Sequence, residues 1–587
     1  MIARFDDLRT GRGVLLGTPH SVASTHDLDG VRPLLAEAEA HARGGSWVAV
    51  AVAYEAGPAF DPAQTVHPPE DGLPLAWYAA VDDVQLTEAI TRGTGAVDVT
   101  GIERRGGADW YGRSVDEIRE IIASGSAYQI NLTDRLDGTL HGDPLDLYAR
   151  MATAQRGRFN AYLDLGDHVI VSASPELFFE TRGAMVQSRP MKGTIRRSAR
   201  PHDDADAARQ LAASEKDRAE NVMITDLLRN DIGRVARIGT VRVPSLLRME
   251  RYETVWQLTS TVTGEIEPDV TLVDLFDALF PCGSITGAPK VSAMRHITAL
   301  EPWARGMYCG AIGLLRPQGA DEPRPRSVFS VAIRTAVVRR GNDGGPALLT
   351  YGAGGGITAD SEPDAENREV DAKAAVLTAE RTEFRLLETM RAEDGSVLHL
   401  DRHLDRLAGS AHHFDFDIDE AHVRALLEAL AADVAGPHRL RLLLARDGTT
   451  ATTLDPIADE PGPVRLRLAE AAVDSHAELM VHKTSERSVY DEIAAQHPDA
   501  DDVILWNLAG DVVETCRANL LFRIGGRWCT PPLSSGGLAG VGRAALVHEG
   551  SVEERRLTID ELRTVDELHV VSALRGRRAA VLLDGPE

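Results

Sequence analysis

The sequence predicts an α+β protein with at least two domains. The chain has 587 residues, more than one ordinary hydrophobic core holds together. Hydrophobic residues make up 43% and charged residues 26% of it, proportions that are typical of globular proteins. Stretches with strand-like content, such as residues 47–54 (WVAVAVAY) and 169–173 (VIVSA), alternate with helix-like stretches throughout.

Two helices are predicted from local patterns. Residues 114–124 (SVDEIREIIAS) are amphipathic, and we expect Ser114 to cap this helix with Glu117 as its capping-box partner. Residues 362–380 are rich in Ala and Glu and open with Pro363, which favours a second helix. The next residues, RTEFRLLETM, have the character of a strand that begins a new unit. We therefore place the domains at 1–378 and 384–587.

The overall charge and the cysteine pattern narrow the class of protein. The net charge is -26 at neutral pH, which argues against nucleic-acid binding because that depends on Lys and Arg at phosphates. No apolar run is long enough to span a membrane, and MIARFDDLRTG lacks the apolar core of a signal peptide. The four cysteines form no CxxC pair, so we expect neither a zinc site nor a disulfide framework. A cytoplasmic enzyme is the expected class.

Two pairs of acidic residues have helical spacing. Asp217 and Glu220 are three residues apart, as are Glu366 and Glu369, and Lys373 follows four residues after Glu369. On helices each set would share one face. Two facing carboxylate pairs would suit Mg²⁺, which takes a few carboxylates together with water and substrate oxygens. The same spacing also occurs on solvated helix faces with ordinary salt bridges.

Eight ordered motifs carry a family resemblance in the first domain: YQINLT (128–133), SPELF (174–178), RPMKGTIRR (189–197), KDRAENVMITDLLRND (216–231), GSITGAPK (283–290), CGAIG (309–313), AIRT (332–335) and YGAGGGITADSEPDAENREVDAK (351–373). Together they resemble the chorismate-utilising enzyme family over about residues 1–375. The resemblance implies an α/β domain with a two-sheet sandwich core. It also implies Mg²⁺ bound by Glu220, Glu366 and Glu369, with Asp217 adjacent.

The resemblance also assigns the substrate-binding residues. Arg334 and Lys373 match positions that hold a substrate carboxylate, a role that suits a guanidinium fork and an ammonium group. Backbone N–H groups of the loop that contains Gly283 and Thr286 would complete an anion cradle. Gln129 stands where water-adding relatives have a Lys base, which matches the members that use ammonia.

Lys192 marks the reaction type within this family. In the resembling anthranilate-forming enzymes this position is Ala, whereas Lys in PMKGT is typical of aminodeoxychorismate synthases. The implied role is nucleophilic: Lys192 adds at ring C2, the C4 hydroxyl leaves, and ammonia then adds at C4 and expels the Lys. Glu176 of SPELF matches the general acid that protonates the departing hydroxyl.

A second ordered set of motifs covers the C-terminal part: LLETMRAEDG (386–395), HLDRL (403–407), HKTSER (482–487), GDVVETCRANLLF (510–522), TPPL (530–533), GLAGVGR (537–543) and VVSALRG (570–576). The set resembles the fold-type IV pyridoxal-phosphate enzymes, which include branched-chain aminotransferases and aminodeoxychorismate lyases. The resemblance implies that Lys483 binds the cofactor covalently, that Glu514 pairs with the pyridine nitrogen, and that Arg406 holds the phosphate. Val541, Gly542 and Ser572 are the further candidates for phosphate contacts.

Together the two resemblances predict a bifunctional enzyme that converts chorismate and ammonia into 4-aminobenzoate and pyruvate, with Mg²⁺ and pyridoxal 5'-phosphate as cofactors. Lys483 would also move the ring C4 proton. No Gly-x-Cys-x-Gly nucleophile motif is present, so we expect ammonia from a separate glutamine amidotransferase subunit. Fold-type IV enzymes are commonly dimers, which makes a homodimer through the C-terminal domain a further expectation. Two alternatives remain: an anthranilate synthase with an appended transaminase, and a synthase with a non-catalytic C-terminal domain.

Overall fold

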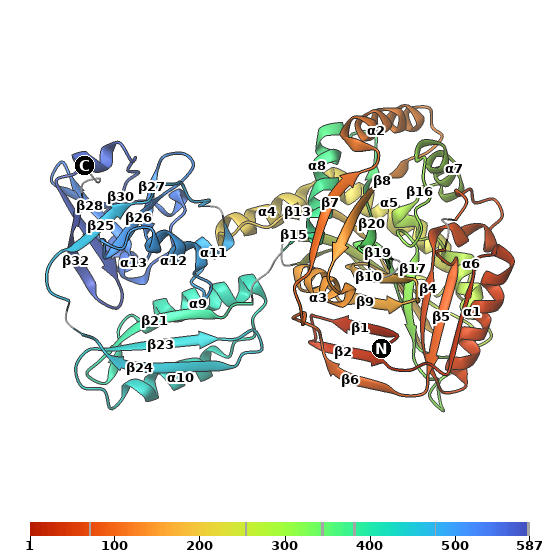
Figure 1. Cartoon of the computed structure of the whole chain (residues 1–587), viewed down its shortest axis with the longest axis horizontal. Coiled ribbons are helices and arrows are strands. Elements are labelled where there is room, and N and C mark those ends of the chain that lie inside the picture. The colour runs from red at the N-terminus through yellow and green to blue at the C-terminus, as the bar shows by residue number, and fades with distance from the viewer. Residues whose placement is uncertain are drawn as a thin grey trace. The chain divides into compact units, whose positions relative to one another are not determined.

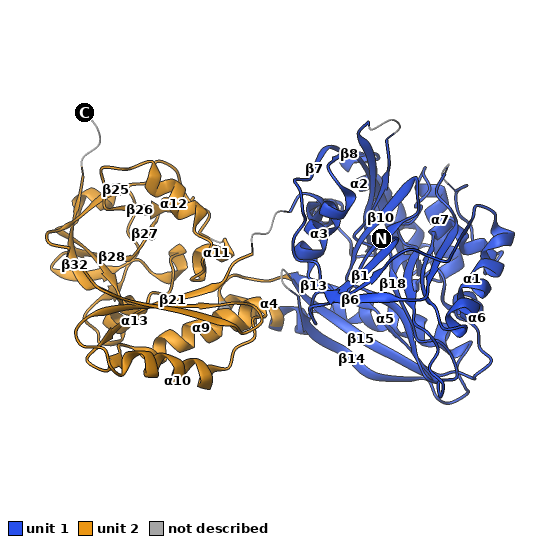
Figure 2. Cartoon of the chain, turned by 60° about the horizontal axis from the view of Figure 1, so that its bottom comes forward, with its two compact units in different colours: residues 1–195, 209–381 blue, residues 196–208, 382–587 orange. Residues whose placement is uncertain are grey.

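The chain folds into two compact units. The computed structural model describes residues 1–69, 72–252, 255–341, 345–379, 383–458, 460–475 and 477–583. Unit 1 consists of Met1–Ile195 and Arg209–Arg381, and unit 2 of Arg196–Ala208 and Thr382–Glu587 (Figure 2). The short segment 196–208 therefore folds with unit 2, although the motif that it overlaps, 189–197, lies mostly in unit 1 and the next motif, 216–231, lies wholly in unit 1. The expected boundary at 378–384 did not include this segment, and residues 380–382 at that boundary lie outside the described residues.

Unit 1 contains the two-sheet core that the sequence resemblance implies (Figure 1). In spatial order the first sheet comprises β16 (Gly287–Ala288), β8 (Gln129–His141), β20 (Ala347–Ile357), β19 (Thr335–Arg339), β10 (His168–Ser174), β9 (Phe159–Asp164), β1 (Ala3–Asp7), β2 (Arg12–Leu16) and β6 (Val84–Glu88), with β7 (Asp98–Arg104) paired to β8. The second sheet comprises β13 (Met191–Arg196), β15 (Val255–Glu265), β12 (Met185–Arg189), β11 (Leu177–Arg182), β18 (Ser327–Val331), β17 (Ala311–Leu315), β4 (Trp47–Val52), β5 (Ala76–Val81) and β3 (Ser21–Thr25), with β14 (Arg242–Arg251) paired to β15.

Strand β4 is buried on both of its faces. This explains why its sequence is a continuous apolar run rather than an alternation of apolar and polar residues. Val48, Val50 and Val52 pack in the cluster that contains residues of α1 (Leu28–Arg43) and α6 (Leu272–Leu279). Ala49 and Ala51 belong to the cluster that the two sheets share. Successive side chains of a strand point to opposite faces, so a strand buried on both faces is apolar at every position.

Helices cover the outer faces of the two sheets. The cluster on the first sheet joins strands β8, β19 and β20 to residues of α2 and α3, whereas α1, α5 and α6 contribute to the cluster on the second sheet. The remaining helices of unit 1 are α2 (Gly107–Ala123), α3 (Pro144–Gln155), α5 (Glu215–Gly233), α7 (Lys290–Leu300) and α8 (Pro363–Ala374), with the short η1 (Tyr54–Ala59), η2 (Gly283–Ile285) and η4 (Ala375–Leu377). Helix α4 (Pro201–Ala213) begins in the segment that folds with unit 2.

One predicted helix start is wrong. Helix α2 begins at Gly107, and Ser114 is a buried residue inside the helix rather than its cap. The start depends on a contact from a distant strand, because the Gly106 N–H donates to Asp134 Oδ1 at 2.9 Å. A capping-box pattern in the sequence cannot reveal a tertiary contact of this kind.

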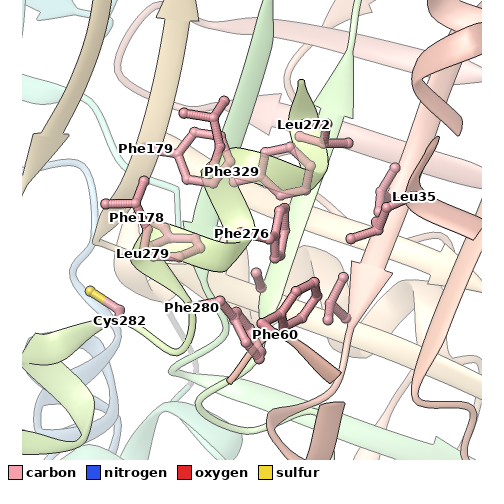
Figure 3. Packing of buried hydrophobic residues seen from close by; sticks show 14 of the residues in the cluster. Leu35, Phe60, Phe178, Phe179, Leu272, Phe276, Leu279, Phe280, Cys282 and Phe329 are labelled. Carbon is pink, nitrogen blue, oxygen red and sulfur yellow. The ribbon is translucent and has the colours of Figure 1, made fainter. Parts of the chain in front are cut away.

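Aromatic side chains brace the strand that follows Glu176 (Figure 3). Phe178 and Phe179 of β11 pack against Phe276 of α6, with ring centroids 6.0 and 5.7 Å apart. Phe329 of β18 stacks on Phe179 at 5.0 Å. Edge-to-face and offset aromatic pairs add to the free energy of area burial, so the start of β11 has a rigid support.

Unit 2 has two sheets. The four-stranded sheet comprises β22 (Ser396–Val397), β21 (Leu386–Glu393), β23 (His438–Leu444) and β24 (Thr450–Pro456). The eight-stranded sheet comprises β27 (Val512–Thr515), β26 (Asp502–Trp506), β25 (Val464–Leu468), β32 (Gly576–Leu582), β31 (Glu567–Ser572), β28 (Asn519–Ile524), β29 (Arg527–Thr530) and β30 (Glu553–Glu554). Its helices include α9 (Leu400–Phe414), α10 (Glu420–Ala431), α11 (Glu478–Val481), α12 (Ser488–Ala495) and α13 (Val541–His548). Within the described ranges, no helix combines the length and apolar character that a membrane crossing requires.

Candidate active sites

Lys192 and Gln129 lie against the same glycine in unit 1. Gln129 begins β8 and is fully buried, and Lys192 lies on β13 of the other sheet. A Cβ atom on Gly356 would lie 2.1 Å from Gln129 Nε2 and 2.9 Å from Lys192 Nζ, so only glycine leaves room for both side chains. No described residue hydrogen-bonds to either polar atom of the Gln129 amide. A buried amide in this state requires a partner from a ligand or water.

Glu176 lies where the chain crosses from β10 of the first sheet to β11 of the second. Burial raises the pKa of its carboxyl group to about 7, although a hydrogen bond with Ser284 and the charges of Lys192 and Lys373 act in the opposite direction. Its Oε1 has no hydrogen-bond partner in the part of the chain that the structure describes. A carboxyl group with a pKa near neutrality can serve as a general acid.

The predicted metal-binding carboxylates come from two helices, as the sequence spacing predicts. Asp217 and Glu220 lie on α5, and Glu366 and Glu369 lie on α8. A Cβ atom on Gly355 of β20 would lie 3.1 Å from Glu366 Oε2 and 3.6 Å from Glu369 Oε1. The run GAGGG therefore separates the carboxylates beside Gly355 from the Gln129 amide and the Lys192 amine beside Gly356.

Burial and mutual repulsion perturb these acids. Burial raises the pKa of Glu220, and the charge of Glu366 adds to the rise. Burial likewise raises the pKa of Glu366, with a contribution from Glu369. Lys373 lowers the pKa of Glu369, because its Nζ lies 2.6 Å from Glu369 Oε1. Carboxylates crowded in this way favour a bound cation.

Two cations accompany the carboxylates. Lys373 Nζ donates to Gly354 O at 2.6 Å. Arg334 lies at the second crossing between the sheets, between β18 and β19, and has a left-handed φ of 52°. Its Nη1 donates to Lys373 O at 3.5 Å. Both predicted carboxylate-binding residues therefore lie beside the carboxylate pair of α8.

The loop with Gly283 and Thr286 packs directly on the strand of Gln129. A Cβ atom on Gly287, whose φ is +134°, would lie 2.2 Å from Gln129 O. Thr286 uses its own donors within the loop: its N–H bonds to Gly283 O, and its hydroxyl bonds to Cys282 O at 3.1 Å. Thr286 thus holds the loop in place, and anion binding by this loop stays a prediction.

Sequence reasoning missed the residues that support this site. Arg305 and Glu301 form a buried ion pair at 2.6 Å, and Arg305 also donates to Ile285 O and Asn131 O, which ties the loop to β8. Ser284 hydrogen-bonds with Glu176 and lies 3.1 Å from Cys282 Sγ. Arg305 lies outside every motif, and an Arg four residues after a Glu is by itself an ordinary helical pair.

Lys483 is the candidate cofactor lysine of unit 2. Its backbone carbonyl accepts from the Leu387 N–H at 2.9 Å. Burial lowers the pKa of its amine to about 8, and the charge of Arg406 lowers it further while Glu388 and Glu514 oppose the shift. An amine with a pKa near 8 is partly neutral at physiological pH, which nucleophilic attack requires.

Arg406 is held by an acid that sequence reasoning did not single out. Its Nε and Nη2 donate to the two oxygens of Glu388 at 2.9 and 2.6 Å, and its Nη1 donates to Ala539 O at 3.0 Å. His403 Nδ1 lies 2.7 Å from Glu388 Oε2. Although burial acts in the opposite direction, Arg406 and His403 hold the pKa of Glu388 down to about 2. The alternation along β21 places Glu388 among inward-facing residues, and that pattern could have identified it.

Glu514 and the start of α13 are the remaining candidate cofactor-binding features of unit 2. Burial raises the pKa of Glu514 to about 8, and Asn519 Nδ2 donates to its Oε2 at 3.1 Å. Val541 and Gly542 are the first residues of α13, where N–H groups lack partners within the helix. A Cβ atom on Gly542 would lie 2.8 Å from the carbonyl carbon of Ser572. The predicted phosphate-binding residues thus gather at this helix start, to which Arg406 is bonded through Ala539.

The family models match both units. Residues 94–379 match the model of the chorismate binding enzyme family, and residues 385–581 match the model of amino-transferase class IV. The chain therefore joins a chorismate binding enzyme domain to an amino-transferase class IV domain.

Individual relatives refine the first assignment. Aminodeoxychorismate synthase component 1 from Klebsiella aerogenes is 44% identical over 259 residues, which cover 44% of this chain and 55% of the relative. Anthranilate synthase component 1 from Streptomyces coelicolor is 39% identical over 316 residues, covering 53% of this chain and 54% of the relative. The chain thus spans about half the length of the curated relatives it matches. The crystal structure of anthranilate synthase component I from Streptococcus pneumoniae has a TM-score of 0.53 and 23% identity, covers 63% of this chain and 92% of that chain, and supports the fold.

Proposed function

We propose that the chain makes 4-aminobenzoate in two steps, with the amination of chorismate in unit 1 and the elimination of pyruvate in unit 2. The observation that carries the first step is the position of Lys192 Nζ beside Gly356, next to the buried amide of Gln129. Glu176, whose pKa is about 7, lies close enough for the charge of Lys192 to affect it. An amine nucleophile and a protonated acid are the two groups that displacement of a hydroxyl requires.

In the first step the neutral amine of Lys192 adds at ring C2, both ring double bonds shift, and the C4 hydroxyl leaves with a proton from Glu176. Ammonia then adds at C4 and expels Lys192, so that 4-amino-4-deoxychorismate and water are formed. The amide of Gln129 cannot deprotonate water, which favours ammonia as the second nucleophile. We expect this ammonia from a separate glutamine amidotransferase subunit.

The acids of α5 and α8 fit Mg²⁺. Among residues placed in the structure, no group of three or more His, Cys, Asp or Glu is arranged to hold a metal. Mg²⁺ commonly uses one or two carboxylates and completes its octahedron with water and substrate oxygens. Glu366 and Glu220, whose pKa values are raised by burial and by neighbouring carboxylates, fit that need. Arg334 and Lys373 would pair with the carboxylates of chorismate, which is a dianion.

The residues of unit 2 fit pyridoxal 5'-phosphate. Bound there, the cofactor supplies an electron sink for the charge that develops on a substrate carbon. Lys483 binds the cofactor and moves the proton from ring C4. Glu514, held by Asn519, pairs with the pyridine nitrogen, and Arg406 with the start of α13 holds the phosphate. Loss of the C4 proton and cleavage of the C3–O bond release pyruvate and leave an aromatic ring. A homodimer through unit 2 is part of the proposal.

Anthranilate synthesis is the second candidate, because the anthranilate synthase relative matches a larger share of the chain than the first relative does. The two reactions differ in the ring carbon that receives ammonia, C2 for anthranilate and C4 for 4-aminobenzoate. Lys192 favours C4, since occupation of C2 by the Lys directs ammonia to C4.

The test of the synthase step is Lys192→Ala. During turnover with chorismate, Mg²⁺ and ammonium, intact mass of the wild type should show a ring adduct that the variant lacks. The variant should make the 4-amino product at least about 100-fold more slowly, or divert ammonia to C2. Wild-type rates of the 4-amino product in the variant would show that Lys192 is not the nucleophile.

A further inference from the structure

Segment 196–208 lies against the residue that directly precedes Lys483. This segment is separated in sequence from the rest of unit 2 but folds with it. Ala199 O lies 2.8 Å from His482 Nε2. Its Arg197 is buried and forms an ion pair at 2.8 Å with Asp204, with 1% and 8% of the two side chains exposed. Unit 2 therefore contains a buried charged contact that lies outside the amino-transferase class IV match.

Arg197 holds the C-terminal end of α9. Its Nη1 donates to His413 O at 2.7 Å, and its Nη2 lies 2.9 Å from His413 Nδ1. Because guanidinium only donates, His413 Nδ1 must accept, and the neutral ring then carries its proton on Nε2. That nitrogen lies 3.5 Å from Glu478 Oε1. Helix α9 also carries Arg406, so Arg197 fixes the end of the helix that presents the phosphate-binding residue.

His482 is held at both ring nitrogens. Because Ala199 O only accepts, His482 Nε2 donates to it, and Nδ1 accepts from Ser410 Oγ at 2.9 Å. The ring stacks on His413 with centroids 4.4 Å apart and planes inclined by 26°. Four contacts thus fix the His482 side chain: a carbonyl from segment 196–208, a hydroxyl and an imidazole from α9, and the ring of Phe414 in a T-shaped contact with centroids 4.8 Å apart.

Fixing His482 also fixes Lys483. His482 has extended backbone angles, φ −107° and ψ 143°, so the side chain of the next residue points to the opposite side. The Lys483 carbonyl is bonded to the Leu387 N–H at 2.9 Å. The backbone at Lys483 is therefore held on one side by the His482 imidazole and on the other by β21. The position of the Lys483 Cα atom, and with it the direction of the side chain, is fixed.

We propose that segment 196–208 is a positioning element of the cofactor-lysine site: Arg197 and Ala199 hold His413 and His482 so that Lys483 projects toward Glu514 and Arg406. The proposal rests on the proposed function of Lys483. It means that the second reaction of the chain depends on a segment encoded within the first domain, which begins four residues after the nucleophile Lys192.

The experiment uses the full chain with Arg197→Met and Asp204→Asn combined. The double change removes both buried charges, whereas a single change would remove one member of the ion pair and keep the other charge buried, which destabilises the fold. Arg196→Met is the matched control, because Arg196 is the exposed neighbour in the same segment. Ser410→Ala is an independent second variant, which removes the donor to His482 and places the best helix former in α9.

The readouts are the visible band of the cofactor, the rate of borohydride labelling at Lys483, and pyruvate release from supplied aminodeoxychorismate. We expect labelling rate and kcat to fall about 10- to 100-fold in the double variant, since a displacement of about 1 Å has effects of that size, with KM changed less than about threefold. Ser410→Ala should act in the same direction and Arg196→Met should match the wild type. Amination of chorismate should stay within about twofold, which serves as the folding control for unit 1, and the nearly unchanged KM for aminodeoxychorismate serves as the folding control for unit 2.

Wild-type labelling and kcat in either the double variant or Ser410→Ala would overturn the positioning role. Lys483→Ala separates this inference from the proposed function. If borohydride labelling persists in Lys483→Ala, the assignment of Lys483 itself is wrong. If labelling is lost there but normal in the double variant, only the role of segment 196–208 fails.

Discussion

The two candidate sites use burial in opposite ways. Around Lys192 burial acts on acids and raises the pKa of Glu176 to about 7, so that a carboxyl group carries a proton near neutrality. Around Lys483 burial acts on the amine itself and lowers its pKa to about 8. Desolvation disfavours the charged form of either group. The same physical effect thus favours a protonated carboxyl group in unit 1 and a neutral amine in unit 2.

The sites also differ in how their charges are paired. In unit 1 the carboxylates of α5 and α8 repel one another, which favours a bound cation. In unit 2 the charge of the buried Glu388 is already paired with Arg406, and His403 is hydrogen-bonded to the same carboxylate. We therefore expect unit 1 to respond strongly to metal removal and unit 2 to be insensitive to it.

The largest expected effect is that of Lys483→Ala. The chain has five lysines, and Lys483 is the only one after Lys373, so unit 2 contains no substitute amine. Pyruvate release should fall more than about 1,000-fold, while chorismate is still consumed and aminodeoxychorismate accumulates. Mass spectrometry of the products measures both. Undiminished 4-aminobenzoate would remove the lyase assignment of unit 2.

Glu366→Ala should affect unit 1 alone. Loss of one of the few carboxylates available to Mg²⁺ should lower chorismate turnover by at least about 100-fold, because metal catalysis is worth several kcal/mol. The visible cofactor band of unit 2 should not change. Glu362→Ala, four residues earlier and outside the carboxylate group, is the matched control. Normal turnover of Glu366→Ala at ordinary Mg²⁺ would contradict the metal assignment.

The pH dependence of the two sites should have opposite signs. Glu176 acts as an acid only when protonated, so at a fixed concentration of free ammonia it should contribute to kcat/KM of the amination a limb that falls about tenfold per pH unit above about 7. Lys483 attacks only as the neutral amine, so the rate at which the cofactor-free chain captures pyridoxal phosphate should rise through about pH 8. Stopped-flow absorbance follows the second rate. Glu176→Gln should remove the first limb, and an unchanged limb in that variant would assign it to another group.

The smallest expected effect concerns the cysteines of the cores. Cys282 and Cys529 are buried at 3% and 2% exposure, in unit 1 and unit 2 respectively. Each change to Ala should lower the free energy of unfolding by about 1 kcal/mol, measured by denaturant titration. Cys282→Ala should change the amination rate by less than about threefold, because Ser284 still bonds to Glu176. A loss of more than about tenfold would show that the thiol has a direct part in the reaction.

The sandwich is implied by the family resemblance that the ordered motifs carry, whereas the helical faces of the acids follow from their local spacing. The sequence places Asp217 and Glu220 on one helix and Glu366 and Glu369 on another, as the structure does. The run GAGGG resembles a phosphate loop without its Lys-Ser/Thr ending. In the structure this run lies between Lys192 and the carboxylates of α8, and that position depends on the register of β20 on β8.

What the sequence does not predict are contacts between distant segments. Gly106 starts α2 through Asp134, and Glu388 neutralises Arg406 eighteen residues away. The fold of segment 196–208 with unit 2 depends on Arg197 meeting His413, 216 residues further along. No local pattern encodes such pairings, since each follows from the packing of elements that are separately predictable.

The most direct test of the bifunctional assignment is the product mixture of the unmodified chain. Pure protein is incubated with chorismate, Mg²⁺, ammonium and pyridoxal 5'-phosphate, and products are separated and identified by mass and fluorescence. The account predicts 4-aminobenzoate and pyruvate in equal amounts, with aminodeoxychorismate as a transient species. Anthranilate as the product, or aminodeoxychorismate that persists while no pyruvate forms beyond the rate without enzyme, would contradict it.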